Sequence, residues 1–225
     1  MNYPTKEHEE YIEYMKQICN ANRLSLILKG SLAHGTAKKY SDIDLLLTGD
    51  LTYRLTGSLL EKIITGYDKL VMTNLTENPD GIYVLNYENG ISVDLDIRRS
   101  LYTTDILKYE LLCLNGILIT DELERRFIPC DCMPERPDWY KTIRLIHRCC
   151  VKYLCGKVDV AQGLTEEVRT AIDTLIHEKI DESDSIKLQM KSAFEAIEKN
   201  YPVDEGISKL LGNLFQAMDD MEEQK

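Results

Sequence analysis

The fold is decided by residues 24–48, LSLILKGSLAHGTAKKYSDIDLLLT. Both ends of this stretch are apolar runs typical of short buried strands, and Gly30-Ser31 closes the first run. Successive side chains of a strand point to opposite faces, so Asp42 and Asp44 are expected on one face and the apolar residues between and after them on the other. The pattern therefore predicts two carboxylates held side by side on a buried sheet.

Two neighbouring carboxylates repel each other unless a cation lies between them. Hard oxygen ligands at this spacing suit Mg²⁺, which keeps several of its waters and shares substrate phosphates. Gly30 has no side chain and allows a phosphate to approach the backbone, while Ser31 adds a hydroxyl at an expected helix N-terminus, where anions are favoured. The stretch thus predicts binding of magnesium and a triphosphate. Thr36 and Ser41 are expected either to contact the ligand or only to order the loop.

A second pair of acidic residues follows in a predicted hairpin. The runs 83–87 and 91–97 flank Asn89-Gly90, and Asn-Gly between two such runs is a strong hairpin signal. By strand alternation, Asp94 and Asp96 share one face of the second run.

The rest of the chain divides into two parts that differ in their predicted secondary structure. Before residue 131, a helix is expected at about 5–21, another at 53–65, a strand near 69–74, a helix from Thr104 to Gly116 and an edge strand at 117–120. After residue 131, the pattern predicts helices at about 138–155, 165–180, 184–199 and 204–222, with breaks that include Gly156 and Gly163. We therefore expect an α/β (α+β) domain with a mixed sheet, residues 1–130, and an all-helical bundle domain, residues 131–225.

The amino-acid composition limits the kinds of binding partner that are expected. The 225 residues include 27 Lys and Arg against 38 Asp and Glu, a net charge of −11 that is spread over both halves. A long nucleic acid is disfavoured because its affinity for proteins depends on basic residues, whereas an acidic protein suits a cationic small molecule. No apolar run reaches the roughly 18 residues of a membrane helix, and the polar N-terminus does not resemble a secretory signal. The sequence carries no signal of oligomeric state.

Seven irregularly spaced cysteines favour reduced thiols rather than a disulfide framework, and hence a cytoplasmic protein. A zinc site built from Cys130, Cys132 and the His147 to Cys155 region is disfavoured, because the spacing lacks the paired ligands of structural zinc sites.

The stretch from Gly30 to Leu45, GSLAHGTAKKYSDIDL, closely resembles the signature of the polymerase-β-like nucleotidyltransferase superfamily. The resemblance covers roughly residues 24–100. It implies transfer of a nucleoside monophosphate from an NTP with two Mg²⁺ ions. Gly30 and Ser31 are expected to contact the nucleotide phosphates, and Lys38 either attracts the triphosphate or is a solvated loop lysine.

The resemblance also implies a set of catalytic acids. Asp42 and Asp44 would bind both ions, and a third acidic residue would bind the ion on the side of the acceptor hydroxyl. Asp94, between valine and leucine, fits the expected apolar flanks best. Asp96 remains the alternative, or would serve as an outer or acceptor-binding residue.

A catalytic domain followed by helices is most similar to the small-molecule branch, which includes the kanamycin and other aminoglycoside nucleotidyltransferases. This similarity implies ATP as the donor, a small-molecule hydroxyl as the acceptor in the cleft between the domains, and release of pyrophosphate. The alternatives are a toxin-antitoxin-type nucleotidyltransferase that modifies a protein or tRNA, and a degenerate nucleotide-binding regulator. The regulator is disfavoured because every acidic position is filled.

Overall fold

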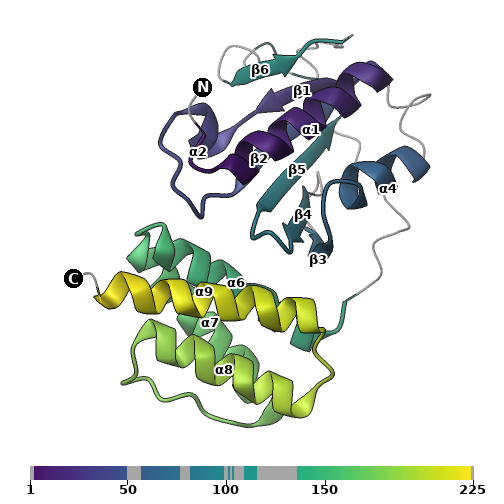
Figure 1. Ribbon diagram of the computed structural model, residues 1–225. Helices are drawn as coiled ribbons and strands as arrows, with labels where there is room; N and C mark the ends of the chain where they lie inside the picture. Colours follow the sequence, from purple (N-terminus) through teal and green to yellow (C-terminus); the bar gives the residue numbers. More distant parts are fainter. Residues whose placement is uncertain are drawn as a thin grey trace. The chain divides into compact units, whose positions relative to one another are not determined.

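The computed structural model places the chain in two compact units, residues 1–134 and 135–225 (Figure 1). The first unit contains a six-stranded sheet with helices, and the second contains helices only. The mixed sheet domain followed by a helical bundle agrees with the fold class predicted from the sequence. The structure describes residues 3–49, 57–76, 82–98, 101, 103, 109–115 and 136–223.

The sheet has the strand order β3-β4-β5-β2-β1-β6. Neighbouring strands are antiparallel except β2 and β5, which lie parallel at its centre. The predicted hairpin is confirmed as β4 and β5, joined through Asn89-Gly90. The strands are β1 Ser25–Leu28, β2 Ile43–Thr48, β3 Leu70–Leu75, β4 Ile82–Tyr87, β5 Ser92–Arg98 and β6 Glu110–Cys113.

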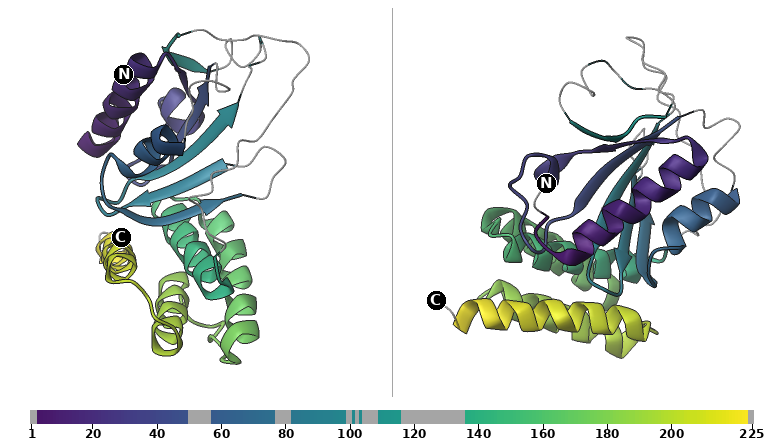
Figure 2. Two further views of the ribbon diagram at one scale, coloured as in Figure 1. Left: turned by 90° about the vertical axis from the view of Figure 1, so that its right-hand side faces the viewer. Right: turned by 45° about the horizontal axis from the view of Figure 1, so that its top comes forward.

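Two helices, α1 (Lys6–Asn22) and α4 (Gly57–Thr65), cover one side of the sheet (Figure 2). The side chains of Leu45 and Leu47 in β2 point into this core, as the alternation in the sequence predicts. Two tyrosines satisfy backbone carbonyls at the end of α4: Tyr14 donates to Lys62 O at 2.6 Å, and Tyr87 donates to Ile64 O at 2.7 Å. The opposite face of the sheet is therefore the one left for the acidic side chains.

The predicted helix ending at Gly116 is wrong, because residues Glu110–Cys113 form strand β6. This strand pairs antiparallel with β1, where Leu26 lies opposite Cys113. Without β6, the buried β1 would be an edge strand with unpaired backbone groups, and that need for pairing overrides the local helical pattern. Thr104, Gly116 and the predicted strand 117–120 lie outside the described residues, as do residues 53–56 of the predicted second helix.

The second unit contains four described helices, each with one apolar face buried in the bundle. They are α6 Asp138–Leu154, α7 Val158–Ile176, α8 Ile186–Asn200 and α9 Glu205–Glu223. The predicted end at Gly156 is confirmed by its φ of 76° just after α6. The predicted break at Gly163 is wrong, because α7 begins before it and runs through it. No helix in the described part of the chain is long and apolar enough to cross a membrane.

Gly163→Ala is expected to raise the free energy of unfolding by roughly 0.5–1 kcal/mol, because alanine favours the helix and restricts the unfolded chain. Gly163 is exposed, and a Cβ added there meets no atom within 4 Å. Urea denaturation would measure the change. Gly156→Ala is the matched control and should lower stability, since its positive φ disfavours any side chain. If Gly163→Ala unfolded at a lower urea concentration than the unsubstituted protein, this account of α7 would be contradicted.

Candidate active site

The turn after β1 lies directly against the carboxylate of Asp44. It leads into α2 (Gly30–Ala33), a single helical turn, and Gly30 has a φ of 62°. A Cβ placed on Gly30 would lie 1.9 Å from Asp44 Oδ2 and 2.7 Å from Asp44 Cγ. The neighbouring Lys29 N–H donates to Asp44 O at 2.8 Å. Both the backbone conformation and the close approach therefore require glycine at this position.

The parallel pairing of β2 with β5 brings two acidic residues together. Asp44 lies opposite Asp94 in the register, and both side chains are half-buried. Adjacent strands are about 4.8 Å apart, so the two carboxylates are immediate neighbours on one face. Asp42 is half-buried and lies just before β2 begins at Ile43.

Asp96 has different surroundings. It lies opposite Leu46 in the register and is only 2% exposed. Its Oδ2 accepts hydrogen bonds from the Arg98 guanidinium and from Lys29 Nζ, the latter at 3.3 Å. The structure thus separates the two candidates for the third acidic position: Asp94 lies beside Asp44, whereas Asp96 is buried in an ion cluster.

The acids form a neighbouring pair rather than an assembled metal centre. Among the described residues, no three His, Cys, Asp or Glu side chains gather into a group that could hold a metal ion. As hard oxygen donors, Asp42, Asp44 and Asp94 are chemically suited to Mg²⁺.

The loop between α2 and β2 is ordered by its own polar residues. The Thr36 hydroxyl donates to Ser31 O at 3.4 Å, and Ser41 Oγ accepts from the Lys38 N–H at 2.8 Å. Thr36 and Ser41 therefore order the loop, which was one of the two roles predicted for them. The Lys38 side chain is exposed, and the nucleotide contacts of Gly30, Ser31 and Lys38 remain predictions.

One residue that positions this loop was not identified from the sequence. His8 in α1 is 1% exposed, and its Nε2 lies 3.0 Å from Ser41 O. A carbonyl only accepts, so Nε2 carries the proton, and Nδ1 accepts from the Thr5 hydroxyl at 2.8 Å. His8 thereby ties α1 to the residue just before Asp42. No spacing or motif in the N-terminal segment signals this contact.

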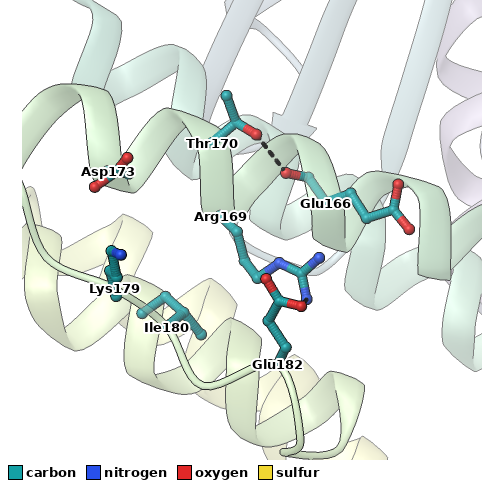
Figure 3. Close-up of a pocket in the computed structure, with 7 residues that line it drawn as sticks. All are labelled: Glu166, Arg169, Thr170, Asp173, Lys179, Ile180 and Glu182. Carbon is teal, nitrogen blue, oxygen red and sulfur yellow. Dashed lines mark hydrogen bonds and ion pairs between the residues drawn. The ribbon is translucent and has the colours of Figure 1, made fainter.

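A separate hollow of about 330 Å³ lies within the helical unit, along α7 and the segment that follows it (Figure 3). Its lining has mixed charge, and Arg169 faces Glu182 across it with an N–O distance of 3.9 Å. None of the residues predicted to be catalytic lies in this hollow. Its lining residues are Glu166, Arg169, Thr170, Asp173, Lys179, Ile180 and Glu182.

Residues 8–110 match the family model described as "Nucleotidyltransferase domain". The matched span contains Gly30-Ser31, both acidic pairs and all strands of the sheet up to the first residue of β6. The match indicates that the first unit carries a nucleotidyltransferase domain and that the protein is a nucleotidyltransferase. A comparison with curated proteins found no match.

Proposed function

We propose that the protein transfers a nucleoside monophosphate, with ATP as the favoured donor, to a hydroxyl group of a small molecule in a magnesium-dependent reaction. The acceptor oxygen would attack the α-phosphorus, and the bond to the β-phosphate would break with release of pyrophosphate. The observation that carries the proposal is the pairing of Asp44 with Asp94 directly beside Gly30.

Asp42, Asp44 and Asp94 are the residues proposed to hold two Mg²⁺ ions. When bound, Mg²⁺ would neutralise the triphosphate and favour deprotonation of the acceptor hydroxyl. Gly30 leaves the backbone accessible to phosphate, and Ser31 offers its hydroxyl at the same turn. The exposed Lys38 would attract the donor from the loop side.

The acceptor is proposed to be a cationic small molecule, because acidic residues outnumber basic ones by 38 to 27. We assign acceptor recognition in part to the helical unit, residues 135–225, since the family match and the acidic pairs all lie before it. This division of roles follows the architecture of small-molecule nucleotidyltransferases and is an analogy.

A pyrophosphate-release screen would test the acceptor class. Each NTP would be combined with Mg²⁺ and a panel of hydroxylated cationic compounds, aminoglycosides included, and parallel reactions would contain tRNA or protein acceptors. The proposal expects release with a cationic compound and a product heavier by one nucleoside monophosphate. Transfer only to tRNA or protein would overturn the small-molecule assignment and support the toxin-antitoxin type of activity.

ATP binding is expected to tighten at least about tenfold when Mg²⁺ is present, because the paired carboxylates repel a free triphosphate and attract its magnesium complex. Calorimetric titration with Mg²⁺ and with EDTA would measure both dissociation constants. AMP is the control ligand and should depend far less on the metal, since it lacks the β- and γ-phosphates. Equal ATP affinity in the two conditions would count against the magnesium site.

A further inference from the structure

A buried ion cluster lies on the same face of the sheet as Asp44 and Asp94. At its centre, the Asp96 side chain is 3% exposed, and its Oδ2 contacts both Lys29 and Arg98. Asp96 Oδ1 is buried without a hydrogen-bond partner among the described residues. One carboxylate oxygen is therefore shared by two cations.

Lys29 is the more accessible of the two cations, with a side chain 21% exposed against 11% for Arg98. It immediately precedes Gly30, and its backbone N–H is bonded to Asp44 O. Its Nζ also lies 5.7 Å from the centre of the Tyr109 ring. The Lys29 backbone thus lies at the start of the turn against Asp44, and its ammonium group lies by Asp96 on the same face of the sheet.

The two cations are not held equally tightly by Asp96. Arg98 lies closer to Asp96 Oδ2 than Lys29 does, so Lys29 is the more loosely held of the two cations. Lys29 is also the more exposed cation, and it is the residue directly before Gly30, where glycine leaves the backbone accessible. A triphosphate has the charge that complements it.

We propose that Lys29 contacts the phosphates of the donor nucleotide and that Asp96 acts as its positioning residue. This inference rests on the proposed function, because it requires an NTP to bind beside Gly30. It assigns Asp96 a role other than metal binding and adds a phosphate contact at Lys29.

The test is a calorimetric comparison of Lys29→Met with the unsubstituted protein in Mg²⁺. Lys29→Met should weaken ATP binding about tenfold and leave AMP binding nearly unchanged, since only the longer phosphate chain loses its contact. Lys29→Arg retains the charge and should restore most of the ATP affinity. A lysine with a purely structural role would not change the ratio of ATP to AMP affinity.

Lys16→Met is the matched control. Lys16 is also a partly buried, ion-paired lysine, with a side chain 31% exposed and Nζ 2.6 Å from Glu13, but it lies in α1 away from the acidic face. Its replacement should leave both affinities unchanged. Thermal unfolding would establish that each variant is folded.

Asp96→Asn tests the positioning role. It should weaken ATP binding by about the same factor as Lys29→Met, and the double variant should lose little more, because both changes disrupt one interaction. The Mg²⁺ dependence of ATP binding should persist in Asp96→Asn and be lost in Asp94→Asn. If Asp96→Asn fails to fold because Arg98 loses its counter-charge, the Lys29 variants still test whether Lys29 contacts the phosphates.

Two outcomes of the ATP titrations distinguish failure of this inference from failure of the proposed function. If the unsubstituted protein binds Mg²⁺-ATP tightly and folded Lys29→Met binds it equally well, this inference is wrong and the proposed function stands. If the unsubstituted protein does not bind ATP with or without Mg²⁺, both the proposed function and this inference are wrong.

Discussion

Asp44→Asn is expected to lower kcat/KM for nucleotidyl transfer by about 10³-fold or more while the protein stays folded. Asparagine has nearly the same volume as aspartate and fits the same space against Gly30. The substitution removes only the charge, which faces Asp94 across the central pair of parallel strands. Pyrophosphate release with the identified acceptor would measure the loss, and near-ultraviolet circular dichroism would verify the fold.

Stability should move in the opposite direction to activity. Removing one of two neighbouring like charges relieves their repulsion, so the free energy of unfolding of Asp44→Asn should not fall below that of the unsubstituted protein. Asp159→Asn, at an exposed position in the first turn of α7, is the control and should retain full activity. Substantial turnover by folded Asp44→Asn would disprove the mechanism, whatever the acceptor.

The local part of the site could be predicted from the sequence because it depends on short-range rules. Strand alternation places Leu45 and Leu47 in the core and leaves Asp44 on the other face, and the structure agrees. The Asn89-Gly90 hairpin likewise follows from the turn conformations that these residues favour.

The distinction between Asp94 and Asp96 could not be predicted in this way. Both lie on one face of one strand between apolar neighbours, so local pattern treats them almost alike. They differ through the register of β5 on β2, which joins segments about fifty residues apart in the sequence and places Asp94, not Asp96, beside Asp44. The same limitation explains the error at β6, whose strand conformation depends on pairing with β1.

Lys29 and His8 were missed for a related reason. Each has an ordinary local context, one at the end of a strand and the other in the first turns of a helix. Their importance comes from single long-range contacts, Lys29 with Asp96 and His8 with the carbonyl of Ser41. Such contacts leave no periodic signal in the sequence, and only the assembled fold displays them.

Gly30→Ala is expected to inactivate the enzyme about as completely as Asp44→Asn, although it adds one methyl group and removes no charge. The added carbon would lie 1.9 Å from Asp44 Oδ2, far inside van der Waals contact, so the carboxylate must rotate away or the turn must shift. Either movement separates the acid from the turn proposed to receive the phosphates. Calorimetry with Mg²⁺-ATP should therefore show a large loss of affinity.

Gly35→Ala isolates the effect of that clash from the effect of backbone strain. The two glycines have nearly the same φ, 62° and 66°, but a Cβ on Gly35 meets no atom within 4 Å. Gly35→Ala should thus lose roughly 1 kcal/mol of stability from strain alone and keep most of its ATP affinity. Gly30→Ala should suffer the same strain and lose the affinity as well. If urea denaturation and calorimetry gave the same result for both variants, the contact between Gly30 and Asp44 would have no functional role.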